Sequence, residues 1–503
     1  MPRTSRDMRI ERRVTAAVLG LTMLAVVGTA SAAGDAQAVA TPRAGGTPTL
    51  QPRAPAPRPQ TAAGEQWVAT WGTALQLARF AGGPGGRPPG APGASAPSGA
   101  PGAPGAPATT PPPPPQGFPP RRFGAPVEIP RLADQTVRMI VRTSIAGRRV
   151  RIRLANAFGG TTVSIGAAHV ARRASGSAVV AGSDRALTFG GKPNTLLYAG
   201  QTLVSDPVDL DIPALTDLAV SLYIAGDAGA PTAHRFGLRP TYVSTSGNHA
   251  AAAAIDALEA TTESYYWLAG VDVLAPASAG TIVAFGDSIT DGDQSTPDTN
   301  RMWPALLAAR LQAQATTRGV GVVNAGIAGN RLLGDNNGGA VRFVAHALTV
   351  PGVRWITVLE GINDITIAGR RFGQPPAAAP IGSPATTPAL PPVTADDLIG
   401  AYRQMIESAH LHGIRVIGCT LTPFGGSSAY SERGEAMRQA VNEWIRTSGA
   451  FDAVVDFDAV TRDVTDPQRF RPEAESPDLL HPGDGGYRLM AEAFDLALFV
   501  RRR

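Results

Sequence analysis

The residue type best placed to do chemistry is a serine at the end of an apolar run. The segment Thr281 to Phe285 is followed at once by Gly286-Asp287-Ser288, which predicts a buried strand that delivers Ser288 into a sharp turn. An α/β enzyme places a nucleophile at such a turn, although the tripeptide alone is also typical of an ordinary strand-to-loop connection. Ser288 is therefore a candidate nucleophile that needs partners.

A histidine and an aspartate near the C-terminus are the partners that such a serine requires. A serine hydroxyl becomes a good nucleophile when a base removes its proton, and a carboxylate helps by fixing the tautomer of that base. His481 is the candidate base, and Asp478 lies close enough in sequence to reach it within one loop. Taken alone, Asp478 as a turn cap and His481 as a surface histidine explain the same residues.

Attack on an ester carbonyl also needs hydrogen-bond donors aimed at the developing oxyanion. The backbone N–H of Ser288, the N–H of Gly329 in a loop and the side-chain amide of Asn363 are candidates. A turn glycine at Gly329 and an Asx-turn at Asn363 are the structural alternatives.

Alternating strands and helices position these residues. Apolar runs, each read as a strand, are Thr281 to Phe285, Val320 to Val323, Trp355 to Leu359, Ile414 to Cys419 and Ala453 to Phe457. The helical stretches between and after them lie near residues 301–314, 338–349, 395–412, 431–447 and 483–500. This alternation predicts a parallel sheet with helices on both faces. Ser288, Gly329 and Asn363 each follow a strand, at the sheet edge where such folds bind ligands.

Within the helix near 431–447, one buried stripe is expected, formed by Met437, Ala440, Val441, Trp444 and Ile445. The sole cysteine, Cys419, lies in an apolar run, which predicts a buried structural thiol.

Four blocks occur in a fixed order, namely Gly286 to Ser288, Asn324 to Asn330, Gly361 to Asp364 and Asp478 to His481. Together they resemble the conserved blocks of the SGNH (GDSL) hydrolase family over about residues 279–500, and we expect the hydrolase domain over residues 279–503. The resemblance implies a flavodoxin-like domain with a five-stranded parallel sheet. It also implies a catalytic triad of Ser288, Asp478 and His481 and an oxyanion hole of Ser288, Gly329 and Asn363. The family is one of esterases and lipases that need no metal and no cofactor.

Residues 65–275 show a different pattern, in which apolar and polar residues alternate. The alternation is clearest in Thr136 to Arg142, Val150 to Leu154 and Leu218 to Ile224. A period of two predicts half-buried antiparallel strands, and we expect a β-sandwich of the jelly-roll kind. Such a domain is similar to accessory domains of some secreted family members. Gly- and Pro-rich inserts are expected at about 82–124 in this domain and at about 369–392 in the hydrolase domain.

The N-terminus has the composition of an export signal. Five arginines precede the apolar stretch Val14 to Val27 and a small-residue run, which predicts a signal peptide over residues 1–32 and a disordered linker over 33–64. An uncleaved N-terminal anchor and a twin-arginine signal are alternatives. We expect a secreted, extracellular or periplasmic protein with no stable membrane span after cleavage.

Charge argues against a nucleic-acid partner. Removing residues 1–32 lowers the formal net charge from +5 to about +2, and the remainder contains no basic block with interleaved aromatic residues.

No metal site is expected from the remaining acids and histidines. Asp291, Asp293 and Asp298 lack the bidentate glutamate of a calcium loop, so we expect solvated loop acids. His410 and His412 are spaced to face different sides of a helix. The other four histidines outside the catalytic blocks have no ligand-spaced partners; they are His169, His234, His249 and His346.

The sequence thus predicts a secreted serine ester hydrolase that forms an acyl-enzyme and acts on acetylated carbohydrate or short-chain esters. A lipase or arylesterase, or an acyltransferase, would use the same triad. A catalytically idle protein that binds glycan or cell wall is the alternative from another class. The oligomeric state is not predicted.

Overall fold

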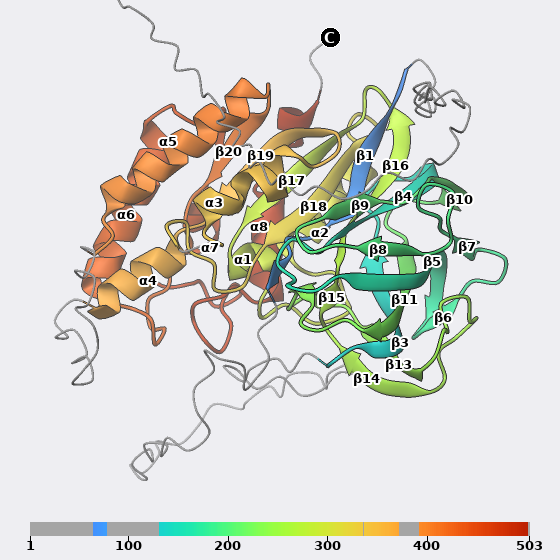
Figure 1. The fold of residues 1–503 in the computed structure, drawn as a ribbon. Helices are drawn as coiled ribbons and strands as arrows, with labels where there is room; N and C mark the ends of the chain where they lie inside the picture. Colours follow the sequence, from blue (N-terminus) through green and yellow to red (C-terminus); the bar gives the residue numbers. More distant parts are fainter. Residues whose placement is uncertain (1–63, 78–129, 335–336, 372–391, 501–503) are drawn as a thin grey trace, which may run out of the picture. The chain divides into compact units, whose positions relative to one another are not determined.

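Antiparallel strands occupy the first half of the described chain, and alternating strands and helices occupy the second (Figure 1). The structure is a computed structural model, and it describes residues 64–77, 130–334, 337–371 and 392–500. The predicted signal peptide, the linker and both inserts lie outside these ranges, apart from residues at their edges.

Five parallel strands form the sheet of the second half, and they match the five apolar runs. Their order across the sheet is β18-β17-β19-β20-β21. Their bounds are β17 Gly280–Gly286, β18 Val320–Gly326, β19 Val353–Leu359, β20 Arg415–Cys419 and β21 Ala453–Val455. The first strand lies inside the sheet, between the second and the third, which is the flavodoxin-like order. The chain therefore changes winding direction at β17, the strand that leads to Ser288.

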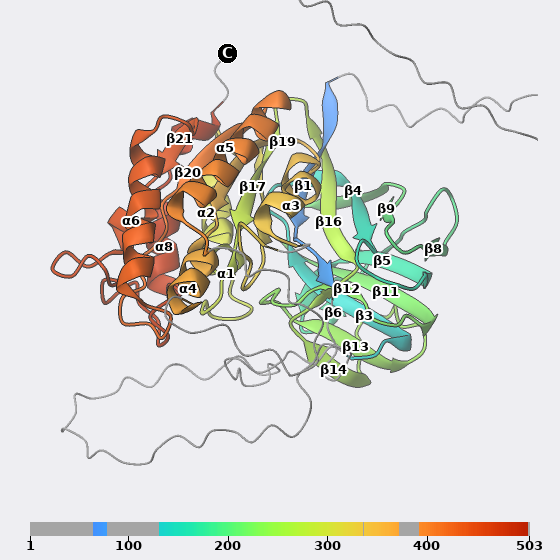
Figure 2. The same cartoon turned by 60° about the vertical axis from the view of Figure 1, so that its left-hand side comes forward.

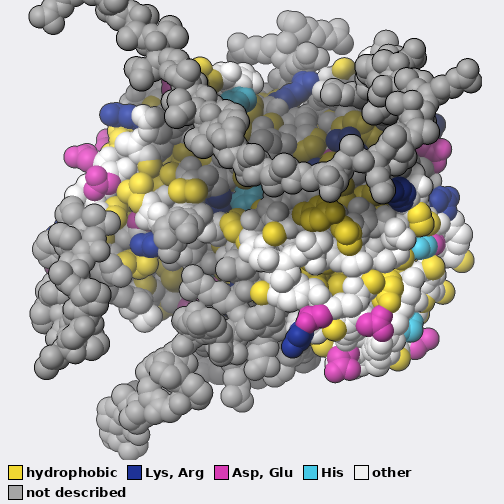
Figure 3. All heavy atoms as spheres, in the orientation of Figure 1, with side chains coloured by type: hydrophobic (Ala, Val, Ile, Leu, Met, Phe, Trp, Pro, Cys, Tyr) yellow, Lys and Arg dark blue, Asp and Glu magenta, His cyan; other side chains and the backbone are white. Residues whose placement is uncertain are grey.

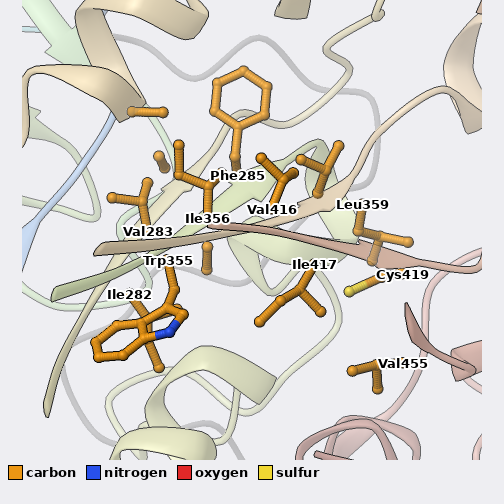
Figure 4. Packing of buried hydrophobic residues seen from close by; sticks show 14 of the residues in the cluster. Ile282, Val283, Phe285, Trp355, Ile356, Leu359, Val416, Ile417, Cys419 and Val455 are labelled. Carbon is orange, nitrogen blue, oxygen red and sulfur yellow. The ribbon is translucent and has the colours of Figure 1, made fainter. Parts of the chain in front are cut away.

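Both faces of this sheet are apolar, which explains the continuous apolar runs. In Figure 4, Phe285 and Val416 lie on one face, and Trp355 and Ile417 lie on the other. Neighbouring residues in the parallel register share a face, as Ile356 and Val416 do. All of these side chains belong to one buried cluster, and Cys419 is buried within it as predicted.

The helices cover both faces, as the alternation predicts. The contacts group α3, the adjoining π-helical turn, α5 and α6 on one face, and α2, α7 and α8 on the other. Figures 1 and 2 show α5 and α6 side by side. Their bounds are α1 Ser288–Asp291, α2 Trp303–Ala313, α3 Gly339–Phe343, the π-helical turn Val344–Leu348, α4 Ile362–Arg371, α5 Ala395–Leu411, α6 Glu432–Thr447, α7 Phe457–Thr461, α8 Asp484–Glu492 and a final 3₁₀ turn Leu496–Phe499.

Three expectations about the helices are wrong. The last helix ends at Glu492 rather than near residue 500, and Phe457 begins α7 instead of ending a strand. In α6, Met437, Val441 and Ile445 of the expected stripe are buried, but Ala440 is exposed and Trp444 half-buried, because Arg438 and Asn442 occupy part of the buried face. Arg438 is buried against Asp458, with 2.6 Å between Nη1 and Oδ1. A charged helix face therefore packs inward, which a hydrophobic pattern does not reveal.

The antiparallel half contains two larger sheets and one small one. The strand orders are β1-β16-β4-β10, with β9 beside β4, then β14-β13-β3-β11-β5-β6, with β7 and β8 beside β5, and lastly β15-β12-β2. The bounds are β1 Glu65–Gly72, β2 Gln76–Leu77, β3 Ala133–Arg142, β4 Gly147–Ala155, β5 Val163–Ser175, β6 Ala178–Val179, β7 Arg185–Ala186, β8 Thr195–Leu197, β9 Thr202–Val204, β10 Val208–Ile212, β11 Asp217–Asp227, β12 Thr232–His234, β13 Thr241–Ser246, β14 Leu258–Thr262, β15 Tyr265–Tyr266 and β16 Leu268–Pro276.

One apolar cluster joins the inner faces of the two larger sheets. It includes Ile152 and Val271 from the first sheet and Val137 and Leu222 from the second. Side chains alternate between this cluster and the outer face, as the period of two predicts. We call this antiparallel half the sandwich; its jelly-roll connectivity and the predicted domain bounds stay predictions.

The sandwich and the parallel sheet meet along β1 and β18. The N–H of Ala69 donates to the carbonyl of Pro351 at 2.9 Å, and the N–H of Val322 donates to Ser144 Oγ at 2.9 Å. The described residues accordingly belong to one compact unit. The edge strand β18 is thus covered rather than left open.

Candidate active site

Ser288 stands where β17 gives way to α1. It is the first residue of α1, and Asp287 caps that helix by accepting the N–H of Ile289 at 3.0 Å. The first N–H groups of a helix have no acceptor within it, so the N–H of Ser288 is suited to a ligand. Ser288 is buried, and burial raises the pKa of the neighbouring Asp287 carboxyl.

His481 lies between Ser288 and Asp478 and is hydrogen-bonded to both. Its Nε2 is 2.8 Å from Ser288 Oγ, and its Nδ1 is 2.6 Å from Asp478 Oδ2. Nδ1 faces a carboxylate that accepts only, which leaves Nε2 free to accept the serine proton. The structure thus brings Ser288 together with Asp478 and His481, a pair that is distant from it in the sequence, in an order and at distances suited to proton transfer.

Asp478 is held by several further donors. Its Oδ1 accepts the N–H groups of Leu480 and His481, both at 3.0 Å, and the hydroxyl of Ser476 at 2.9 Å. Gln294 Nε2 donates to Oδ2 at 3.3 Å. Burial alone would raise the pKa of Asp478, but the bond to His481 and the backbone donors keep that pKa below its usual range. The carboxylate is therefore ionised and fixed in orientation.

The charge of His481 is set by burial and by two nearby carboxylates. Burial alone would lower the pKa of this imidazole, but the bond to Asp478 and the charge of Asp293 raise it above its usual value. Asp293 Oδ2 lies 3.9 Å from His481 Nε2, on the serine side of the ring. Asp293 thus favours the imidazolium form.

Asp293→Asn should shift the pH profile of ester hydrolysis. The base must be neutral to accept the serine proton, so activity rises with pH through the His481 pKa. Removing the charge of Asp293 lowers this pKa, and we expect the acid limb of kcat/KM to move to lower pH. The matched control is Asp209→Asn, because the Asp209 side chain is 85% exposed in the sandwich. An unchanged limb in Asp293→Asn would show that this carboxylate has no influence on the base.

The two other candidate oxyanion donors lie after β18 and β19. Gly329 has φ of +75°, a conformation that favours glycine, and a Cβ there would meet nothing within 4 Å. Asn363 is in the first turn of α4, and its Nδ2 donates to the carbonyl of Asn330 at 2.8 Å. The amide keeps a second N–H for a ligand, so both groups are available as donors.

A comparison with protein-family models matches residues 282–494 to the GDSL-like lipase/acylhydrolase family. Residues 282–494 belong to this family. The matched segment, which we call the GDSL domain, contains Ser288, Gly329, Asn363, Asp478 and His481. Because it contains a domain of this family, the protein is a carboxylic ester hydrolase.

Solved structures similar to this chain include esterases. One is a putative lipolytic protein of the G-D-S-L family from Desulfitobacterium hafniense, at 22% identity over 42% of this chain and 96% of that chain, with a TM-score of 0.31. Another is an acetyl-xylooligosaccharide esterase from Geobacillus, at 23% identity over 44% of this chain and 97% of that chain, with a TM-score of 0.32. A comparison with curated proteins gives no match.

A buried arginine that sequence reasoning missed lies beneath the site of the GDSL domain. Arg342 in α3 donates to the carbonyls of Gly286 and Ala325, both at 2.7 Å, and to Asn330 Oδ1 at 2.6 Å. Glu360 Oε2, also buried, is 3.2 Å from Arg342 Nη2. Arg342 therefore ties together the ends of β17 and β18 and the loop that carries Gly329. A lone arginine in an otherwise apolar predicted helix was the available signal.

Two acids after Ser288 are not solvated, contrary to expectation. Asp291 is 4% exposed, and its Oδ1 lies 3.0 Å from Nε2 of His234 in the sandwich. Asp298 lies 3.1 Å from Arg173 and 3.0 Å from Arg239, two further sandwich residues. The prediction failed because these partners are distant in sequence. Asp293, half-buried beside His481, is the third acid of this segment.

Proposed function

We propose that this protein is a secreted serine ester hydrolase in which Ser288, His481 and Asp478 form the catalytic triad. The observation that carries the proposal is the pair of hydrogen bonds of His481, at 2.8 Å to Ser288 Oγ and 2.6 Å to Asp478 Oδ2. Membership of the GDSL family supports ester chemistry for this arrangement.

In the proposed reaction, Ser288 Oγ attacks the ester carbonyl carbon while His481 Nε2 takes the hydroxyl proton. The N–H groups of Ser288 and Gly329 and the amide of Asn363 stabilise the oxyanion. His481 then gives its proton to the departing alcohol, which leaves an acyl group on Ser288. Water attacks the acyl carbon and loses a proton to His481, and the acid is released when the proton returns to Ser288.

The proposed substrates are acetylated carbohydrates or other short-chain esters outside the cytoplasm. The export-type N-terminal sequence favours substrates that a cell meets outside its membrane. No helix in the described ranges is long and apolar enough to span a membrane. On the face shown in Figure 3, basic, acidic and hydrophobic side chains are interspersed over the part that is not grey.

A catalytically idle binding protein is the weaker proposal. Idle relatives of enzymes usually lose the nucleophile or the base, whereas here Ser288 and His481 are both present and in contact. An acyltransferase would use the same residues, with an alcohol in place of water in the second step.

A substrate screen tests the proposed function. We expect the purified protein to hydrolyse p-nitrophenyl acetate with a higher kcat/KM than the palmitate ester, and to release acetate from acetylated xylan or pectin. A preference for long chains would contradict the short-acyl proposal. Transfer of the acetyl group to an added alcohol in preference to water would identify an acyltransferase. No turnover of any ester would contradict the enzymatic function itself.

A further inference from the structure

A histidine of the sandwich contacts the helix that carries Ser288. His234 is the last residue of β12, and it is buried. Its Nδ1 lies 2.9 Å from the carbonyl of Ala74, and its Nε2 lies 3.0 Å from Oδ1 of Asp291. A carbonyl only accepts, so Nδ1 carries a proton. Asp291 ends α1, the four-residue helix that begins at Ser288.

The same aspartate also reaches the loop of Gly329. Asp291 Oδ2 accepts the N–H of Ala328 at 3.1 Å, one residue before Gly329. At Gly326 a Cβ would lie 2.3 Å from the backbone N of Asp291, so the end of β18 and α1 are in close contact. Asp291 is therefore one link between the segments that carry two proposed oxyanion donors, the N–H groups of Ser288 and Gly329, and it is the link that His234 holds.

We propose that His234 is a positioning residue for the oxyanion hole. By holding Asp291, His234 keeps α1 and the Gly329 loop in one fixed relation, so that both N–H groups point at the same oxygen. This inference rests on the proposed ester hydrolysis. It gives the sandwich a part in the chemistry on every ester, small soluble ones included, rather than a role in binding polymers alone.

A second set of contacts ties the sandwich to the triad. The N–H of Asp298 donates to the carbonyl of Leu238 at 2.8 Å, and its carboxylate pairs with Arg173 and Arg239. Gln294, earlier in the same segment, donates to Asp478. The sandwich thus holds the segment after Ser288 at Asp291 and at Asp298, and this segment contacts the acid of the triad between those points.

Two substitutions of His234 separate positioning from folding. His234→Asn places an amide donor near the Nδ1 position, keeps a bond to Ala74 within reach and loses the bond to Asp291. His234→Gln places a donor near the Nε2 position and retains the bond to Asp291. His169→Gln is the matched control, because His169 forms another histidine–aspartate pair of the sandwich, from Nδ1 to Asp184 at 2.8 Å, and a Gln amide near the Nε2 position loses this bond.

The experiment measures kcat and KM for p-nitrophenyl acetate in the full chain, per active site titrated with a fluorophosphonate, together with the Tm. An ångström-scale misplacement of catalytic groups costs about 10²-fold in rate. We expect His234→Asn to lower kcat by about 10- to 100-fold with KM within about twofold. His234→Gln should recover most of the loss, and His169→Gln should behave as wild type.

A wild-type kcat in His234→Asn overturns the inference. Equal losses of kcat in His234→Asn and His234→Gln that only parallel a fall in Tm overturn it as well. Should His234→Asn not fold, Asp291→Asn decides. It removes the carboxylate that His234 holds, and wild-type kcat there overturns the inference. An active wild type with an inactive Ser288→Ala keeps the proposed function in either case. An inactive wild-type protein would contradict the proposed ester hydrolysis itself, on which this inference rests.

Discussion

Ser288→Ala should lower kcat for p-nitrophenyl acetate by about 10⁴-fold or more while the protein stays folded. Without Oγ, no acyl-enzyme forms, and the 2.8 Å contact with His481 has no proton to transfer. The remaining oxyanion donors and substrate binding leave only a small residual rate. Steady-state kinetics on purified protein, with circular dichroism as the folding check, give the measurement.

Ser205→Ala is the control for this substitution, since Ser205 is a buried serine of the sandwich, 4% exposed. We expect wild-type kcat from it. If Ser288→Ala hydrolysed the ester as fast as wild type, the triad assignment would be wrong.

Asp478→Asn should lower kcat by about 10⁴-fold as well, through the tautomer of His481. Oδ1 accepts three donors, two N–H groups and the Ser476 hydroxyl, so the Asn oxygen takes that position. The NH₂ group then faces His481 Nδ1 at the position where Oδ2 lies at 2.6 Å. Nδ1 must now accept, Nε2 carries the proton, and the imidazole no longer accepts a proton from Ser288.

The matched control is Asp463→Asn. Asp463 Oδ1 accepts the N–H groups of Thr465 and Asp466 and the hydroxyl of Thr465, much as Asp478 Oδ1 does. In the described part of the chain the donors to this loop carboxylate are Thr465 and Asp466, neither of them a histidine, so we expect wild-type kcat. Comparable losses in both variants would assign Asp478 to loop structure rather than to catalysis.

The strands of the parallel sheet were predictable because short apolar runs that alternate with helices form few structures other than buried parallel strands. The helix expected near residues 395–412 is confirmed as α5, and the structure shows that Thr394 and Asp397 form a capping box at its start. Asn363 was expected after a strand, and it lies in the first turn of α4, a helix that was not predicted. The expected low-complexity insert begins at about residue 369, inside the last turn of this helix.

The contacts around the site were less predictable, because they depend on pairs of residues far apart in the chain. His234 has no ligand-spaced neighbour in sequence, yet it meets Asp291 in the fold. Arg342 and Arg438 are buried charges with buried acidic partners, an arrangement that a hydrophobic pattern treats as an exposed face. The motif blocks identified the candidate catalytic residues, whereas the residues that position these blocks could be identified only from the three-dimensional structure.

The most direct measurement of the central claim is mass spectrometry of the protein after reaction with a fluorophosphonate, which captures an activated serine. We predict one adduct per chain, located on the peptide that contains Ser288, and no adduct in Ser288→Ala. An adduct on another residue, or full ester hydrolysis by a protein whose Ser288 stays unmodified, would contradict the assignment of Ser288 as the nucleophile.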